Sequence, residues 1–447
     1  MAPPTQDLLT PVAQGLRLSA TLEINELVQD RLNAGNSVVH LGFGEATFPM
    51  QKDVLQAHRD ASSDTSYLPV AGLLKLRESI ARFQTRRLGT DIQAKQVVVA
   101  PGSKPLLFAL FDILSGDVLL PRPSWVSYEP QVMHAGKKLF WVETDEHDRH
   151  TISAASLKKA YDQGVSSGGN PRIMLVNSPS NPTGQAFDSA TIEVITTFCR
   201  ERGITLISDE IYSDVFFGSG TASSPAASGH LNNSQIILTG GLSKTYSAGG
   251  WRVGFAIFPD TEFGSTVKKT ILAYASECWS AASAPAQEAA AVAFDTTPEM
   301  DIYRQQVSST HEACTLRLYQ ALRDCGLAVP EPKGAFYVYP SFHPYTKQLE
   351  ALDIKTSVQL SRWLIEECGL AALPGSVFGE DDEGLQGGRY RLRMATSYLY
   401  FKDQEERYSR GYEVLKQGRA DATGLKLDLL EKAIDSIQKA VAKLKAQ

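Results

Sequence analysis

The chain has 447 residues, of which 43% are hydrophobic and 21% charged, a composition typical of a globular protein with about two domains. The net charge of −6 argues against a nucleic-acid partner held by bulk electrostatics, and no apolar run approaches the roughly 18 residues that span a membrane. The first ten residues, MAPPTQDLLT, lack the basic and apolar regions of a secretory signal. The five cysteines include no CxxC pair, so we expect no disulfide framework, no zinc site and a cytoplasmic location.

The N-terminal part begins as an irregular, proline-containing arm over residues 1–20. Apolar residues then recur at helical spacing over 22–32, and residues 38–45 read as a short strand that runs into a glycine turn. Gly44 either makes that turn or brings a backbone N–H close to a ligand, and its position alone favours the turn. Tyr67 precedes an amphipathic helix and, taken alone, is interpreted as a surface loop residue.

Two strand–turn–helix segments follow. Residues 96–100 form an apolar strand that leads through Gly102, Ser103 and Lys104 into an apolar helix. Free backbone N–H groups and the helix dipole make such a helix start an anion site, although the spacing matches no nucleotide-binding motif. The strand over 117–121 ends before Trp125, which either stacks on a flat ring or fills the core.

Polar residues also follow the next two strands. Asn181 lies in a proline-rich turn after the strand 173–177, where ligands gather in open parallel sheets, or it simply makes an Asn-Pro turn. Asp209 ends the apolar strand with which the segment 204–212 begins, and a carboxylate buried there needs a cationic partner. Tyr212 follows three residues later, on the same side if the turn is helical.

A strand over 236–239 leads into the stretch GGLSKTYSAGGWRVG, which contains Lys244 and, eight residues on, Arg252. A lysine among small residues leaves room for a bulky group on its nitrogen, and an arginine can clamp an anion bidentately. Pyridoxal phosphate needs both an amine for its aldehyde and a clamp for its phosphate. Taken alone, however, a lysine is far more often an ordinary surface residue.

Strands and helices alternate over 96–258, which predicts an α/β domain with a mainly parallel sheet and helices on both faces. After about residue 300, a long helix and an antiparallel pattern predict a smaller α+β domain, to which the N-terminal residues return. We therefore expect an arm and part of the small domain at 1–45, a large domain at 46–300, and a C-terminal small domain at 301–447 that ends in an amphipathic helix. His147 and His150 lie in a polar run that predicts a solvated loop, so we expect no metal.

Together these segments resemble the fold-type I pyridoxal-phosphate enzymes of the class I and II aminotransferase family, in particular the branch of aspartate and prephenate aminotransferases. The resemblance covers about residues 12–405. Three motifs occur in the family's order: SNPTG at 180–184, SDEIY at 208–212 and SKTYSAGGWRVG at 243–254. The resemblance implies the corresponding fold, pyridoxal 5'-phosphate as the cofactor, and a homodimer.

The family's functional residues carry over to the matching positions. Lys244 would form a Schiff base with the cofactor and later move the substrate proton, while Asp209 would keep the pyridine nitrogen protonated. The resemblance assigns the remaining roles as follows: Asn181 and Tyr212 to the phenolic oxygen of the cofactor, Trp125 to its ring face, Gly102, Ser103, Lys104 and Arg252 to its phosphate, Gly44, Asn181 and Arg391 to the substrate, chiefly its α-carboxylate, and Tyr67 to the phosphate bound by the neighbouring subunit.

The sequence departs from the family pattern on the substrate side. The glycine–glutamate pair at 44–45 is followed by Ala-Thr instead of Pro-Asp, and Arg393 stands where a small residue is common, two positions after Arg391. No arginine for a distal carboxylate can be matched, and Arg17 and Arg122 are only weak candidates. These departures leave the amino donor open.

The resemblance implies an aminotransferase that moves an amino group from an L-amino acid to a 2-oxo acid by a ping-pong mechanism. The alternative is a lyase or a β/γ-substitution (C–C bond-forming) enzyme, because one carbanion supports all these reactions on one scaffold. Such an enzyme would release ammonia or a leaving group without needing a 2-oxo acid. A non-catalytic cofactor-binding protein is a remote alternative, because it would be expected to lack Lys244 or Asp209.

Overall fold

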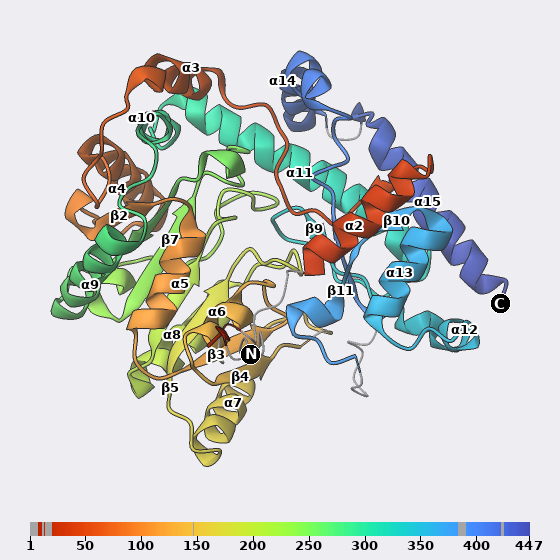
Figure 1. Cartoon of the computed structure of the whole chain (residues 1–447), viewed down its shortest axis with the longest axis horizontal. Helices are drawn as coiled ribbons and strands as arrows, with labels where there is room; N and C mark the ends of the chain where they lie inside the picture. Colours follow the sequence, from red (N-terminus) through yellow and green to blue (C-terminus); the bar gives the residue numbers. More distant parts are fainter. Residues whose placement is uncertain (1–7, 11–12, 14–19, 146, 383–389, 422–423) are drawn as a thin grey trace, which may run out of the picture.

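The central element of the molecule is a seven-stranded sheet in the order β2-β8-β7-β6-β5-β3-β4, in which β8 alone runs opposite to the others (Figure 1). The structure is a computed structural model that describes residues 8–10, 13, 20–145, 147–382, 390–421 and 424–447. The strands are β2 (Val97–Ala100), β3 (Asp117–Arg122), β4 (Leu139–Glu143), β5 (Pro171–Asn177), β6 (Thr205–Asp209), β7 (Ile236–Gly241) and β8 (Gly254–Ile257). The predicted α/β domain with a mainly parallel sheet is confirmed.

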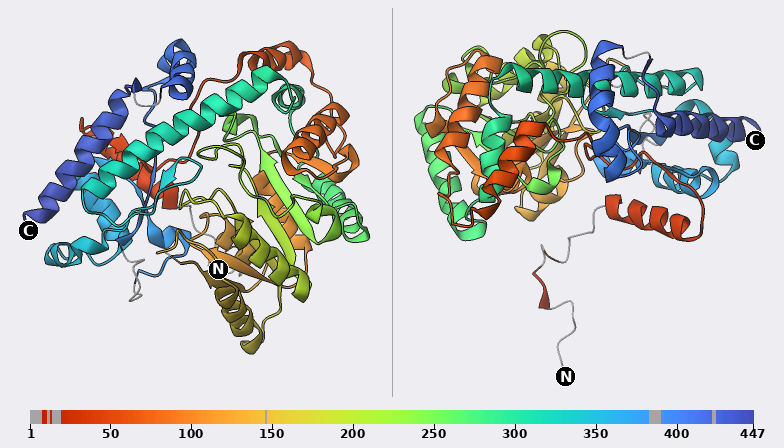
Figure 2. Two further views of the ribbon diagram at one scale, coloured as in Figure 1. Left: turned by 180° about the vertical axis from the view of Figure 1, so that it is seen from behind. Right: turned by 90° about the horizontal axis from the view of Figure 1, so that it is seen from above.

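Helices cover both faces of this sheet (Figures 1 and 2). Side chains alternate between the faces, so Ile173 and Leu175 of β5 join the apolar cluster under α5 and α9, while Met174 and Val176 join the cluster on the opposite face. Because both faces are buried, the strands carry near-continuous apolar runs. The helices of this part are α3 (Lys52–Asp60), α4 (Leu74–Leu88), α5 (Ser103–Ile113), α6 (Tyr128–His134), α7 (Ala154–Ser166), α8 (Ser189–Arg202), α9 (Glu262–Cys278) and α10 (Ala284–Ala293).

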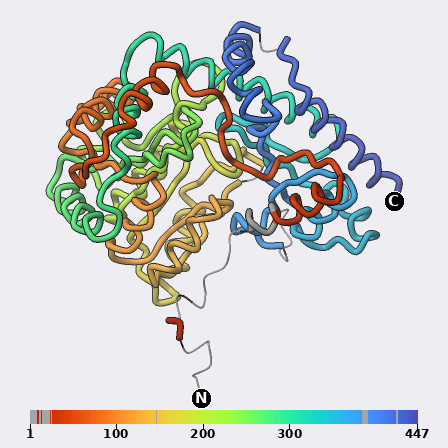
Figure 3. Tube along the Cα trace, turned by 45° about the horizontal axis from the view of Figure 1, so that its top comes forward, coloured from red at the N-terminus to blue at the C-terminus, as the bar shows by residue number. Residues whose placement is uncertain are grey.

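The two ends of the chain meet in a second group of elements. Strand β1 (Val39–His40) pairs in parallel with β10 (Leu370–Ala371), and β11 (Leu373–Pro374), β12 (Leu392–Ala395) and β9 (Tyr337–Val338) form an antiparallel sheet. The tube in Figure 3 shows the N-terminal helix beside C-terminal segments. The helices here are α2 (Ala20–Asn33), α11 (Pro298–Asp324), α12 (Thr346–Ala351), α13 (Ser357–Cys368), α14 (Gln404–Ala420) and α15 (Asp428–Lys445). The domain boundaries at 45 and 300 stay predictions.

The terminal helix α15 carries an apolar face that includes Leu430, Ile437 and Val441, all of them buried. It packs on α11, α12 and α13 and on the paired strands β1 and β10 (Figure 2). The predicted amphipathic helix therefore covers part of the C-terminal core. None of the described helices is long and apolar enough to cross a membrane.

Three local expectations differ from the structure. The strand expected over 38–45 is only two residues long, and the edge strand β4 was not predicted, although four of its five residues are apolar. His150 was expected in a solvated loop, but it is buried, with Nδ1 2.9 Å from Oγ1 of Thr144. Burial lowers the pKa of His150 to about 4, so the imidazole is neutral at physiological pH.

Candidate active site

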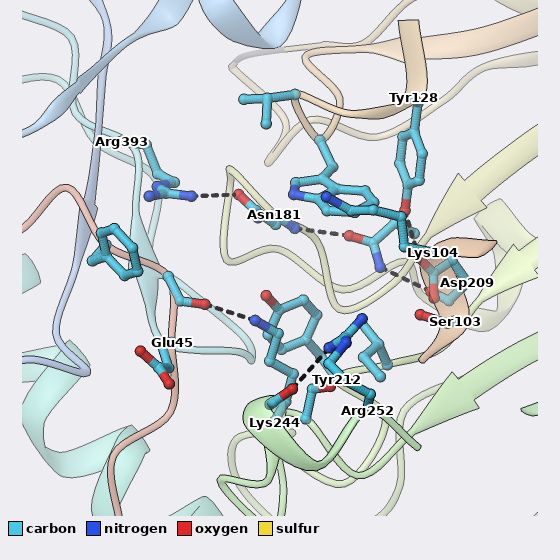
Figure 4. A pocket seen from close by; sticks show the side chains of 18 of the residues that line it. Glu45, Ser103, Lys104, Tyr128, Asn181, Asp209, Tyr212, Lys244, Arg252 and Arg393 are labelled. Atoms are coloured by element: carbon cyan, nitrogen blue, oxygen red, sulfur yellow. Dashed lines mark hydrogen bonds between the residues drawn. The ribbon is translucent and has the colours of Figure 1, made fainter. Parts of the chain in front are cut away.

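A cavity of about 560 Å³ lies at the carboxyl ends of the parallel strands (Figure 4). Its size is that of a site for a cofactor with a small substrate, and its place is where ligands gather in open α/β sheets. Nine of the residues predicted for the site line it: Gly44, Ser103, Lys104, Trp125, Asn181, Asp209, Tyr212, Lys244 and Arg252. Gly102 lies directly behind Arg252, while Tyr67 and Arg391 do not line the cavity.

The carboxylate of Asp209 forms the floor of the cavity, at the end of β6. It is 3% exposed and accepts hydrogen bonds from the hydroxyls of Tyr128 at 2.7 Å and Thr239 at 3.2 Å. Burial raises the pKa of Asp209 to about 6, against the lowering effect of these two bonds. Two neutral donors do not neutralise the charge, so a cationic group in the cavity would stabilise it.

The neighbouring strand holds the asparagine turn in place. Asn177 lies opposite Asp209 in the sheet, and its amide donates to the Asp209 carbonyl at 2.8 Å. Its side-chain oxygen accepts the backbone N–H of Asn181 at 2.9 Å. This pair of bonds directs Asn181 into the cavity, so the Asn-Pro turn carries a lining residue rather than only reversing the chain.

The half-buried Lys244 projects from the loop after β7, and its ammonium donates to the carbonyl of Gly44 at 2.6 Å. Burial is the main cause that lowers the pKa of Lys244 to about 8, and Arg393 adds to the effect. Glu45 and Asp209 act in the opposite direction. A substantial neutral fraction therefore exists near physiological pH, as a nucleophilic amine requires.

The N-terminus of α5 and Arg252 form a cationic cradle on the other side of Lys244. Gly102 has a φ of +90°, and a Cβ atom there would lie 2.3 Å from the Arg252 guanidinium. A Cβ at Gly254 would lie 2.2 Å from the backbone N of Ser103, so both glycines allow this close approach. Partial burial is the main cause that lowers the pKa of Lys104, and the nearby Arg252 guanidinium adds to the effect.

Trp125 lines the cavity half-buried, so it is not simply a core residue. The Lys104 ammonium lies 4.9 Å from the centre of its ring, and Tyr128 packs edge-on against it at 5.2 Å. The indole therefore presents an aromatic surface beside the anion cradle, which suits a flat, negatively charged ligand.

Arg393, rather than Arg391, reaches the cavity. Arg393 is 3% exposed, donates to Oδ1 of Asn181 at 3.2 Å and stacks on the Tyr337 ring at 4.8 Å. Its buried Nε has no hydrogen-bond partner among the described residues. Arg391 is instead ion-paired with Glu380 at 3.0 Å, outside the cavity. Figure 4 shows Arg393 across the cavity from Ser103 and Lys104.

The sequence reasoning missed several lining residues, among them Tyr128, Glu45 and Phe43. Tyr128 had no motif of its own, and its role depends on the pairing of distant strands. The signal that could have found Arg393 was its departure from the family pattern. Tyr67 is 97% exposed, so within one chain it takes no part in the site.

A sequence model of the family described as "Aminotransferase class I and II" matches residues 36–398. An aspartate aminotransferase from Geobacillus stearothermophilus is 32% identical over 402 residues, which cover 88% of this chain and 96% of that protein. The structure of the aspartate aminotransferase from Thermus thermophilus with maleate superposes with a TM-score of 0.76 at 26% identity, over 92% of this chain and 99% of that one. The structure of an aromatic aminotransferase from Pyrococcus horikoshii superposes with a TM-score of 0.74 at 26% identity, over 94% of this chain and 100% of that one.

The lowered pKa of Lys244 predicts its reactivity in the cofactor-free protein. Only the neutral amine reacts with aldehydes, so its rate of reductive methylation should rise with pH, reach half its maximum near pH 8 and level off about one unit above that. The methylation rate of Nα-acetyl-lysine, whose amine has a pKa of about 10.4, should still be rising at pH 9. Mass spectrometry of the Lys244 peptide measures the rate. A profile that follows the free amino acid derivative would contradict the description of this site.

Proposed function

The chain belongs to the class I and II aminotransferase family and catalyses amino-group transfer, and we propose that it does so with pyridoxal 5'-phosphate bound through Lys244. The observation that carries the proposal is the meeting of three features in one cavity: a lysine with a pKa of about 8, a buried carboxylate at a strand end, and a cationic cradle at a helix start. The cofactor has one group suited to each: an aldehyde, a basic pyridine nitrogen and a phosphate.

The cradle suits the phosphate. Ser103 and Lys104 supply the start of α5, where backbone N–H groups and the helix dipole favour an anion. Arg252 adds a guanidinium that can bind two phosphate oxygens at once. A phosphate held here would place its negative charge between the Lys104 and Arg252 cations.

The residues at the bottom and sides of the cavity suit the pyridine ring of the cofactor. Asp209 would hold the pyridine nitrogen protonated, which also provides the cation that this buried carboxylate needs. Trp125 would stack on the ring face, and Asn181 and Tyr212 would donate to the phenolic oxygen. When bound, pyridoxal phosphate supplies the aldehyde that takes up the amino group and the electron-withdrawing ring that stabilises the carbanion.

Lys244 would act twice in each half of the reaction. Its neutral amine would first hold the cofactor. Once the amino acid displaces it, the free amine would take the proton from the substrate Cα and deliver it to the carbon atom that was the aldehyde of the cofactor. The position of Lys244 between Gly44 and the Tyr212 ring, 5.5 Å away, keeps the amine close to both. The donor would leave as a 2-oxo acid before the acceptor binds, which gives ping-pong kinetics.

We assign the α-carboxylate of the substrate to Arg393 in place of Arg391. The supporting observations are that Arg393 lines the cavity, bonds Asn181 and has an unpartnered Nε among the described residues. Arg391 is held in an ion pair with Glu380, and both side chains are 9% exposed. Breaking that pair to bind substrate would leave a buried carboxylate without its partner.

Among the described lining residues, no cation is left over for the side chain of the donor. The cations among the described lining residues are Lys104, Lys244, Arg252 and Arg393, and the roles above use all four. Arg122, a candidate for a distal carboxylate, is paired with Glu143 at 3.2 Å and stacks on Trp141 at 5.0 Å. Arg17 lies outside the described residues. A dicarboxylic donor would therefore need a further cation, such as one from a second subunit.

A homodimer is part of this proposal. Tyr67 leaves its phenol ring 97% exposed in the loop before α4, although an aromatic ring gains from burial. In a dimer, this ring would reach the phosphate bound to the neighbouring copy. The cytoplasmic location stays a prediction from the cysteine pattern.

Replacing the lysine tests the proposal. In Lys244→Ala, the visible absorbance of bound cofactor should disappear and amino transfer should fall by about 10⁴-fold or more, because both the anchor and the proton-transferring amine are lost. The surface control Lys269→Ala should match the native protein in absorbance, activity and unfolding temperature. If Lys244→Ala retained the visible absorbance, another lysine would be the anchor.

The half-reaction tests the type of chemistry. Adding an amino donor alone to the cofactor-loaded protein should release one equivalent of 2-oxo acid per site and convert the bound cofactor to its amino form, as ping-pong transfer requires. Stopped-flow absorbance and product analysis measure both. Release of ammonia over many turnovers, with no need for a 2-oxo acid, would show a lyase instead.

Arg393 in β12 and Arg391 directly before it provide a matched pair of variants that tests which arginine binds the substrate carboxylate. Arg393→Gln should raise KM for amino donors and 2-oxo acids by about 100-fold, because a charge-assisted bond to the carboxylate contributes roughly 2–3 kcal/mol. Arg391→Gln should leave KM within about threefold, although it lowers the unfolding temperature by leaving Glu380 without its ion-pair partner. A large KM effect of Arg391→Gln with a small one for Arg393→Gln would reverse the assignment.

A further inference from the structure

Two buried tyrosine hydroxyls meet beside Lys244. The hydroxyl oxygens of Tyr212 and Tyr337 lie 2.7 Å apart, and the two residues are 2% and 0% exposed. Tyr212 follows β6 of the large sheet, whereas Tyr337 begins β9 of the small antiparallel sheet. The family resemblance implies a role for Tyr212 and none for Tyr337.

The carbonyl of Gly44 links this pair to the lysine. It accepts the Lys244 ammonium at 2.6 Å and lies 3.5 Å from the Tyr337 hydroxyl. A Cβ atom at Gly44 would lie 2.4 Å from that hydroxyl, so only glycine permits this approach. The polar groups therefore run in a chain from Lys244 through Gly44 and Tyr337 to Tyr212.

Each hydroxyl in this chain has a single proton to donate. Burial raises the pKa of both tyrosines, so both are protonated at neutral pH. If Tyr337 donates to Gly44, the bond between the hydroxyls must come from Tyr212. If Tyr212 donates to a ligand in the cavity, Tyr337 must donate to Tyr212. The two hydroxyls therefore reverse direction together.

We propose that Tyr337 is a positioning residue: its hydroxyl donates a hydrogen bond to the Tyr212 hydroxyl, and this turns the Tyr212 proton toward the phenolic oxygen of the cofactor. The inference rests on the proposed function, in which Tyr212 donates to that oxygen. A donor that itself accepts a hydrogen bond is polarised and donates more strongly. The Tyr337 hydroxyl thus helps to keep the phenolic oxygen anionic, which eases loss of the proton from the nitrogen joining Lys244 to the cofactor.

The charged groups facing the two hydroxyls come from several elements. Arg393 of β12 lies over the Tyr337 ring at 4.8 Å, and Lys244 lies over the Tyr212 ring at 5.5 Å. Asp209, at the end of β6, also acts on Tyr212. A change of Tyr337 to phenylalanine keeps the ring under Arg393 and leaves these charges in place, so it removes only the hydroxyl.

The test is the pH dependence of the visible absorbance of the cofactor-loaded protein. In Tyr337→Phe, the apparent pKa of the absorbance transition should rise by about half a unit, because Tyr212 becomes a weaker donor. KM for amino donors should stay within about twofold, because Arg393 keeps its aromatic partner. Tyr212→Phe, which removes the donor itself, should raise the same pKa by about one unit or more.

Tyr345→Phe is the matched control, since Tyr345 is a buried tyrosine whose hydroxyl donates to the Cys325 carbonyl away from the cavity. It should leave the absorbance pKa unchanged, whatever it does to the unfolding temperature. A shift in Tyr212→Phe without one in Tyr337→Phe would overturn the inference and leave the proposed function standing. No shift in either variant would overturn the role of Tyr212 and this inference with it. An equal shift of the absorbance pKa in Tyr345→Phe would mean that loss of any buried tyrosine hydroxyl has this effect, and it would overturn the inference.

Discussion

Asp209 carries a carboxylate to a position that water hardly reaches. Its pKa of about 6 means that the site as a whole disfavours the charged form by roughly 3 kcal/mol relative to an exposed aspartate. This net cost remains although the hydroxyls of Tyr128 and Thr239 already offset part of the effect of burial. A buried carboxylate of this kind is stable when a cation shares the site, and the protonated nitrogen of a pyridine ring is a cation of the right shape. The two charges would then stabilise each other.

The parallel sheet brings the other groups to this carboxylate. Asn177, Asp209 and Thr239 lie in one row across β5, β6 and β7, so the bond from Asn177 to the Asp209 carbonyl and the bond from Thr239 to its carboxylate follow from the register of the strands. The loops that leave these strands on the same edge carry Asn181 and Lys244. The start of α5 supplies the anion cradle at a separate point of that edge. A ligand with a basic nitrogen at one end and a phosphate at the other would satisfy both.

The cofactor side could be predicted from sequence because its residues lie in contiguous segments at strand ends. Lys244 and Arg252 are eight residues apart in one stretch, and Asp209 stands out because a charge ends an apolar strand. The substrate side could not be predicted in this way. Arg391 and Arg393 lie on the same face of a strand, since side chains alternate with a period of two, and only the ion pair of Arg391 with Glu380 shows which one is free to reach the cavity. The partner of Tyr212 is likewise 125 residues away, and no local pattern connects them.

The decisive measurement is the protonation state of the pyridine nitrogen beside Asp209. Protein loaded with cofactor labelled with ¹⁵N in the ring can be examined by NMR in the native form and in Asp209→Asn. We expect a ring nitrogen that is protonated from neutral to mildly alkaline pH in the native protein and that loses the proton when the carboxylate becomes an amide. An unprotonated nitrogen in the native protein at pH 7 would contradict this expectation.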